Sequence, residues 1–136
     1  MKTKIFLNLA VKDLNQAITF FNELGFTVNP KFTNDKGACI VISENINVML
    51  LVKEFYQTFT EKQICDSTTT SEVLISISLD TREKVDEMIG KAVKAGGTEY
   101  LQAKDYGWMY QRSFLDLDGH HWEIFFMDES QIPAEM

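Results

Sequence analysis

The sequence lacks the features of a secreted or membrane-spanning protein. No stretch of it approaches the ~20 apolar residues that a transmembrane helix needs, and the apolar run after its first lysines is soon broken at Asn8. Such a run is typical of a strand rather than of a signal peptide. Its 2 cysteines, Cys39 and Cys65, are far apart in the chain, which argues against a disulfide and against a zinc motif. We therefore expect a cytoplasmic protein that does not bind a membrane.

Positive charge is also scarce. The chain has 13 lysines and arginines against 20 aspartates and glutamates, and its formal net charge is −7. This charge repels phosphate backbones, so nucleic acid is not an expected partner, whereas a cationic small molecule would be attracted. The sequence also has no phosphate-binding glycine loop, no dinucleotide fingerprint and no nucleophile elbow.

The residues that are present predict one domain with a true core, because 45% of the 136 residues are hydrophobic. In the N-terminal half, Asp13 and Gln16 have capping-box spacing ahead of an apolar helical stripe, and Gly25 ends that helix. The other expected elements of this half are strands over 4–11, 26–32, 38–43 and 46–52 and a short helix over 53–59.

The same order of elements then returns. Asp80 and Glu83 repeat the capping-box spacing, and Gly96 and Gly97 end a second helix. The expected strands of this half cover 72–79, 98–103, 110–115 and 121–127, with a hairpin turn over 116–119. The pattern β-α-β-β-β thus occurs twice.

This repeat predicts an α+β fold of two βαβββ modules. We expect the modules to cover residues 4–59 and 72–127, with a linker over 60–71 and a polar tail over 128–136. Alone, each module would leave one sheet face bare, which is a reason for the two to associate. The curved, mixed sheets would then enclose a central cleft, with the helices outside and the ligand in the cleft.

Two motifs at opposite ends of this pattern resemble a known family. The first runs from Val11 through Asp13 and Leu14 to Leu24-Gly25-Phe26, similar to "V-x-D-L … F-Y … L-G-F". The second, from Phe114 to Ile124, resembles the hairpin "F-x-D-P-D-G-x-x-x-E-L", with Leu117 where proline is common. Together they resemble the vicinal oxygen chelate superfamily of glyoxalases, bleomycin-resistance proteins and dioxygenases.

The resemblance implies positions for a metal ion, because enzymes of this superfamily carry one ligand on each of four strands. Carried over by motif spacing, these positions fall on Phe6, Met49, Leu74 and Glu123. Phenylalanine and leucine have no donor atoms, and a thioether is a poor ligand for Zn²⁺, Ni²⁺ or Fe²⁺. We therefore expect no metal or other cofactor. The alternative is a displaced divalent-metal site around Glu123 and His121, which would share one strand face.

Several side chains are candidates for the cleft. Glu123 is either a hydrogen-bond anchor or base for a ligand, or an ordinary strand glutamate paired with Arg112 or a lysine. Tyr106, Trp108, Met109, Tyr110 and Arg112 form a cluster that could grip a flat or anionic molecule. The expected cleft residues are Phe6, Asn8, Met49, Leu74, Trp108, Arg112, His121 and Glu123.

Three functions follow from these expectations. The first is a metal-free protein that binds a small molecule, partly aromatic or cationic, as the antibiotic-sequestering members of the resembled family do. The second is a lyase or dioxygenase with the displaced metal site, in which the candidate catalytic residue is Glu123. The third is a homodimeric interaction protein.

Overall fold

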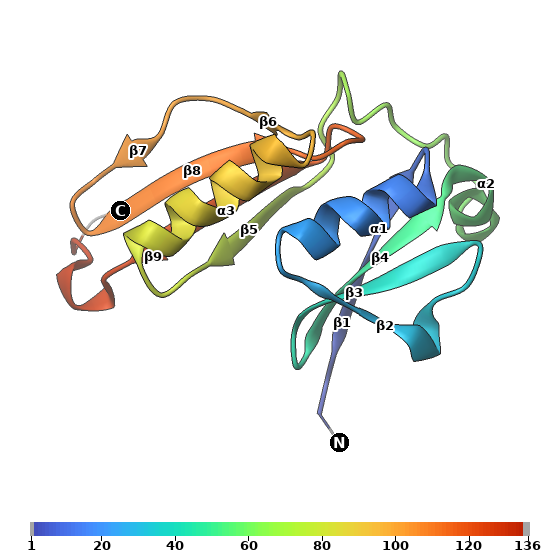
Figure 1. The fold of residues 1–136 in the computed structure, drawn as a ribbon, viewed down its shortest axis with the longest axis horizontal. Helices are drawn as coiled ribbons and strands as arrows, with labels where there is room; N and C mark the ends of the chain where they lie inside the picture. The colour runs from blue at the N-terminus through green and yellow to red at the C-terminus, as the bar shows by residue number, and fades with distance from the viewer. Residues whose placement is uncertain (1, 135–136) are drawn as a thin grey trace. The chain divides into compact units, whose positions relative to one another are not determined.

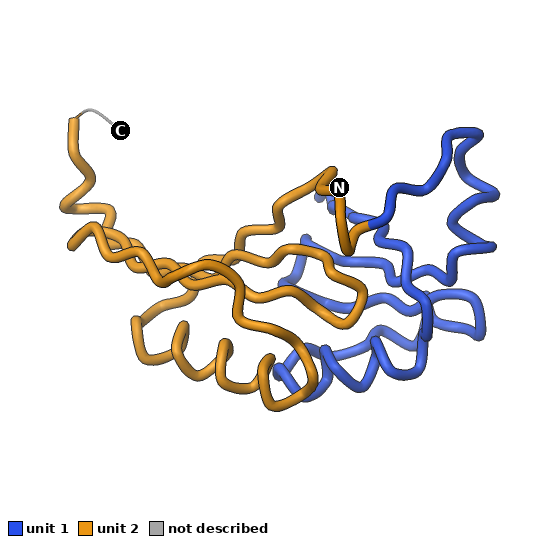
Figure 2. Tube along the Cα trace, turned by 90° about the horizontal axis from the view of Figure 1, so that it is seen from above, with its two compact units in different colours: residues 1–66 blue, residues 67–136 orange. Residues whose placement is uncertain are grey.

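The computed structural model describes residues 2–134 and divides into two compact units, residues 1–66 and 67–136 (Figure 2). The division falls within the stretch predicted to be a linker. Each unit consists of one sheet with a long helix on one face, so the fold is α+β with two mixed sheets, as predicted (Figure 1).

The N-terminal unit contains a four-stranded sheet in the order β1-β4-β3-β2. Its long helix and strands are Ile5–Val11 (β1), Leu14–Glu23 (α1), Thr27–Asn29 (β2), Gly37–Ser43 (β3) and Ile46–Val52 (β4). Strands β1 and β4 are parallel, and the other pairs are antiparallel. Short helical turns follow at Pro30–Phe32 (η1), Lys53–Tyr56 (α2) and Gln57–Phe59 (η2).

Helix α1 forms as its sequence pattern predicts. The side chain of Asp13 accepts a hydrogen bond from the Gln16 backbone N–H at 3.0 Å, which caps the helix. Gly25, with φ +103°, follows the helix end in the left-handed region that favours glycine. The apolar stripe of the helix lies on one face of the sheet, and the buried residues of this core include Phe20, Phe21, Val48 and Leu50.

The C-terminal unit repeats this arrangement with the strand order β5-β9-β8-β6, and the short strand β7 pairs with β8 as well. Its elements are Leu74–Ser78 (β5), Arg82–Lys94 (α3), Thr98–Glu99 (β6), Lys104–Asp105 (β7), Met109–Leu115 (β8), His121–Met127 (β9) and Glu129–Gln131 (η3). Helix α3 lies along β8 and β9 (Figure 1). Their shared core contains Phe114 and Trp122, whose rings stack at 6.1 Å.

Two of the observed strands are less than half as long as the sequence suggested. The strand expected over 26–32 ends at Asn29, because Pro30 lacks the N–H that a ladder needs and begins the turn η1. The strand expected over 98–103 ends at Glu99, because Leu101 adopts a left-handed conformation with φ +62° and turns the chain away from β8.

The start of helix α3 also differs from the prediction. Its N-cap is Thr81, whose side-chain oxygen accepts from the Lys84 backbone N–H at 3.1 Å, and not Asp80. Thr81 has the extended backbone that an N-cap requires. Asp80 instead forms an exposed ion pair with the Lys84 side chain at 3.5 Å.

The β8–β9 hairpin is fixed by one buried carboxylate. Asp116 accepts hydrogen bonds from the backbone N–H groups of Asp118 and His120 and from the Trp122 indole N–H. Gly119 completes the turn with φ +85°. A Cβ on this residue would lie 2.7 Å from the backbone oxygen of Ser67, so only glycine allows the chain to pass so close.

No helix among residues 2–134 is both long and apolar enough to span a bilayer.

Candidate functional site

The C-terminal sheet has one face that α3 does not cover. Strand alternation places Leu74 and Ser76 of β5, Gln111 of β8, and His121 and Glu123 of β9 on this side. We call it the Glu123 face. It contains an exposed apolar residue, Leu74, which is 53% exposed, beside the partly exposed carboxylate of Glu123. A surface that combines an exposed apolar side chain with a carboxylate can hold a small molecule through apolar contact and through hydrogen bonds.

Glu123 is held by its two neighbouring strands. The Ser76 hydroxyl donates to Oε1 of Glu123 at 2.7 Å, and the Gln111 amide donates to Oε2 at 2.9 Å. The predicted alternative in which Glu123 pairs with Arg112 or a lysine is therefore wrong. An ionised carboxylate has about four acceptor positions, so two neutral donors leave room for donors from a ligand.

His121 lies on the Glu123 face in register with Leu74. Its ring meets the Tyr100 ring edge-on, with centroids 5.2 Å apart. Nε2 of His121 is buried and has no hydrogen-bond partner. A buried, unpaired ring nitrogen is unfavourable and is uncommon in folded proteins.

The equivalent face of the N-terminal sheet carries both apolar and asparagine side chains. Phe6 is 41% exposed and meets Phe32 edge-on, with ring centroids 5.8 Å apart. Asn8 is exposed and donates to the Phe6 backbone carbonyl at 3.3 Å, on its own strand. The buried Asn47 side chain donates to the Ile5 carbonyl and accepts from the Cys39 thiol. Cys39 is fully buried, and this burial raises the pKa of its thiol, which opposes the thiolate that a nucleophile needs.

The four transferred metal-ligand positions lie at equivalent points of the two sheets. In the C-terminal sheet Leu74 pairs with His121, and Glu123 lies two residues further on. In the N-terminal sheet Phe6 pairs with Asn47, and Met49 lies two residues further on. Phe6 in the N-terminal sheet therefore corresponds to Leu74 in the C-terminal sheet, and Met49 corresponds to Glu123.

The residues at these positions do not fit a catalytic metal ion. Only Glu123 of the four has an oxygen or nitrogen donor in its side chain. Across residues 2–134, no three or more His, Cys, Asp or Glu side chains are grouped so that they could hold a metal. The displaced site around Glu123 and His121 thus lacks a third ligand of these kinds, which a catalytic site needs.

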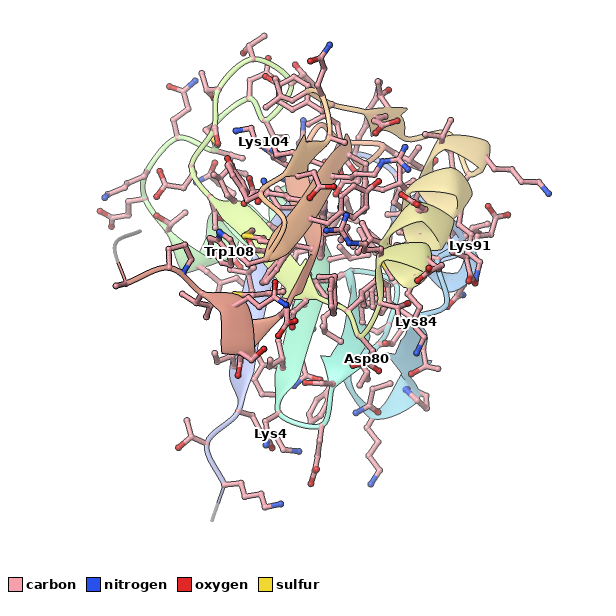
Figure 3. The ribbon with its side chains drawn as sticks, turned by 90° about the vertical axis from the view of Figure 1, so that its left-hand side faces the viewer. Lys4, Asp80, Lys84, Lys91, Lys104 and Trp108 are labelled. Atoms are coloured by element: carbon pink, nitrogen blue, oxygen red, sulfur yellow. The ribbon has the colours of Figure 1, made fainter. Side chains whose placement is uncertain are left out.

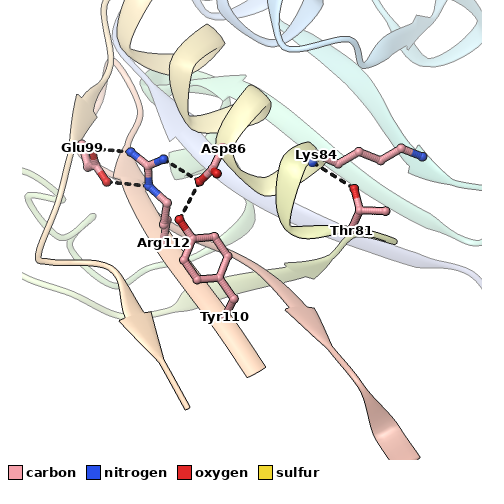
Figure 4. Close-up of polar contacts among 6 residues, drawn as sticks. All are labelled: Thr81, Lys84, Asp86, Glu99, Tyr110 and Arg112. Carbon is pink, nitrogen blue, oxygen red and sulfur yellow. Dashed lines mark hydrogen bonds and ion pairs between the residues drawn. The ribbon is translucent and has the colours of Figure 1, made fainter. Parts of the chain in front are cut away.

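Arg112 is not on the Glu123 face, contrary to the prediction. It pairs in register with Ile124, so its side chain lies on the side of the sheet that α3 covers. There it forms two hydrogen bonds with Glu99, at 2.9 and 2.8 Å, and one with Asp86 at 2.7 Å (Figure 4). The Tyr110 hydroxyl donates to the same Asp86 oxygen at 2.6 Å. Pairing with these carboxylates raises the pKa of Arg112, and the hydrogen bonds from Tyr110 and Arg112 lower the pKa of Asp86.

The predicted aromatic cluster is therefore divided. Figure 3 shows Trp108 away from helix α3, on which Lys84 and Lys91 are labelled. The Trp108 ring stacks on the Tyr106 ring, with centroids 6.3 Å apart. Tyr110 and Arg112 contact α3 through Asp86. Trp108 is half-buried, and the side chains that hydrogen-bond Glu123 are Ser76 and Gln111.

Two functional candidates were missed by the sequence reasoning. Gln111 contacts Glu123, but that contact depends on the β8–β9 register, which the sequence pattern alone does not give. Tyr100 was assigned to a regular strand, and its ring contact with His121 depends on the registers of β6, β8 and β9, which the sequence pattern alone does not give.

Comparison with known proteins agrees with this fold. Residues 3–43 match the family model described as "Bleomycin resistance protein-like N-terminal". A hypothetical protein from S. aureus is 31% identical, with a TM-score of 0.78 over 93% of this chain and 95% of that chain. A glyoxalase/bleomycin resistance protein/dioxygenase family enzyme from Burkholderia phytofirmans is 19% identical, with a TM-score of 0.74 over 90% and 96% of the chains. A fosfomycin resistance protein from Listeria monocytogenes is 18% identical, with a TM-score of 0.66 over 93% of each. A search of curated proteins gave no match.

The doubled βαβββ fold and the matched N-terminal segment define a protein of the glyoxalase and bleomycin-resistance type. The chain belongs to the vicinal oxygen chelate superfamily.

Proposed function

We propose that this protein binds a small molecule on the Glu123 face without a metal ion. The observation that carries the proposal is the geometry of Glu123, which two strands hold in place while its carboxylate stays partly exposed. A fixed carboxylate favours a ligand with N–H donors or a positive charge, because charge-assisted hydrogen bonds are the strong ones. The net charge of −7 adds a long-range attraction for such a cation.

Family membership supports a binding role, since the superfamily includes bleomycin-resistance proteins as well as enzymes. The donor set supports the absence of a metal, because three of the four transferred positions carry Phe6, Met49 and Leu74. Exposed Leu74 adds an apolar contact beside the charge. A ligand with a cationic group attached to an apolar or aromatic body could pair its charge with Glu123 and its body with Leu74.

Ligand binding is tested by titration calorimetry with a panel of cationic amphipathic compounds and their uncharged analogues. Glu123→Gln keeps the side-chain shape and removes the charge, so we expect it to weaken binding of the cationic members by about tenfold or more. The matched control is Glu61→Gln, an exposed glutamate in the other unit, which changes the net charge equally. Equal losses in both variants, or no binding by the wild type, would contradict the proposal.

The metal content of the protein is measured separately. Purified protein is exposed to Zn²⁺, Ni²⁺, Mn²⁺ and Fe²⁺, desalted, and analysed by elemental mass spectrometry. We expect no metal to be retained, because a single carboxylate does not hold a transition metal tightly. Near-stoichiometric metal that Glu123→Ala removes would instead support the lyase or dioxygenase alternative.

A further inference from the structure

Residues 100–107 form an exposed segment that we call the strap. It leaves the sheet after β6, turns at Leu101 with φ +62°, pairs briefly with β8 through β7, and re-enters the sheet at β8. All of its residues are exposed. A segment with so little burial is a candidate for local opening, because few apolar contacts oppose it.

Two arginine forks hold the strap to the helix side of the sheet. Arg112 binds Glu99, the residue just before the strap, through two hydrogen bonds (Figure 4). Arg82 of α3 binds both oxygens of Asp105 at 2.8 and 3.1 Å and also donates to the Gly107 carbonyl at 3.2 Å. The forks therefore fix the start and the end of the strap, and its middle has no such anchor.

The start of the strap also reaches the opposite side of the sheet. The Tyr100 backbone is bonded to Ser113, whose hydroxyl donates to the Tyr100 carbonyl. The Tyr100 ring then lies edge-on to His121, whose Nε2 is buried without a partner. The strap thus connects the arginine forks to the buried, unpaired Nε2 of His121.

We propose that the strap is a latched cover, and that its opening moves Tyr100 off His121 and presents Nε2 to a ligand on the Glu123 face. The role of the ligand in this inference rests on the proposed function. A ligand that hydrogen-bonds Nε2 gains a partner that the closed state leaves unsatisfied, so it favours the open strap. His121 and Glu123 would then bind one ligand with two different polar groups.

The latch is tested without any ligand. Asp105→Asn keeps the shape of the side chain and weakens the Arg82 fork. We expect amide hydrogen exchange in the peptide over 100–107 to rise about fivefold and acylation of His121 by diethyl pyrocarbonate to rise with it. Fragment-ion mass spectrometry separates His121 from His120. The control is Glu87→Gln, which breaks an ion pair with Lys91 on the same helix but away from the strap.

The cover is tested by Tyr100→Ala. We expect His121 acylation to rise while the thermal unfolding midpoint and the exchange over 104–107 stay close to those of the wild type. Tyr106→Ala, which removes another exposed aromatic of the strap, should leave His121 reactivity unchanged. Unchanged acylation in Tyr100→Ala, or faster strap exchange in Asp105→Asn without faster acylation, would overturn the proposal.

These outcomes are separate from those of the proposed function. Failure of Glu123→Gln to weaken binding leaves the acylation and exchange results valid, and they then describe a cover over His121 alone. Failure of the acylation tests overturns the cover and leaves calorimetric binding at Glu123 untouched.

Discussion

At the residue scale, the hydrogen bonds from Arg82 lower the pKa of the Asp105 carboxyl group. The guanidinium hydrogen bonds and the Gly107 N–H lower the pKa of Asp105 from 3.8 to about 2. Because this pKa is lower in the folded than in the unfolded chain, the stabilisation is complete above about pH 4 and is lost as the pH falls through about 2. We expect Arg82→Gln to return the Asp105 titration midpoint toward 3.8, measured by carboxyl ¹³C NMR.

Lys91→Gln serves as the control for that experiment, because it removes a cation from the same helix without touching Asp105. A midpoint that shifts equally in both variants would show that general charge, and not the fork, lowers the pKa.

The sequence predicted the candidate site at this scale only in part. Strand alternation correctly placed His121 and Glu123 on one face of their strand. Arg112 was misplaced because its face depends on which residue lies opposite it in β9, and a sequence pattern does not state that register. The partners of Glu123 depend on the same information, since Ser76 and Gln111 come from the two flanking strands.

At the element scale, the N-cap of α3 separates the predicted from the observed helix start. Thr81→Ala removes the side-chain acceptor for the Lys84 N–H, and we expect it to lower the free energy of unfolding by about 1 kcal/mol. Asp80→Ala removes only an exposed ion pair with Lys84, so a loss within about 0.5 kcal/mol is expected. Urea denaturation measures both; a larger loss in Asp80→Ala would restore the predicted cap.

Elements with a strong pattern were predicted well, and elements without one were not. Helix α1 and strand β9 follow from an apolar stripe, a capping residue and strict alternation. Strand β6 was predicted too long because nothing in its composition signals the left-handed turn at Leu101, a conformation that leucine rarely adopts. The doubled βαβββ order was recovered because helix-ending glycines and turn residues mark its boundaries in both halves.

At the scale of the whole molecule, each sheet ends in a strand with one unpaired edge. Strands β1 and β5 occupy these ends, and Ile5, Phe6 and Leu74 on them are exposed. Open apolar edges tend to find partners. We propose a homodimer and expect light scattering at micromolar concentration to give twice the chain mass of 15.6 kDa.

Ile5→Lys should shift that dimer toward the monomer, because it adds a charge to an exposed edge strand. Val93→Lys is the matched control, since Val93 is similarly exposed but lies on α3. A wild-type chain that stays monomeric at this concentration would refute the dimer.

The hold of Ser76 and Gln111 on Glu123 has a consequence for protein engineering. Placing a histidine at Leu74 would put a further donor on the same face as Glu123, while Ser76 and Gln111 would keep the Glu123 carboxylate oriented. A designed metal site on this face should therefore retain both neighbours, because carboxylates that bind metal ions are commonly oriented by hydrogen bonds of this kind.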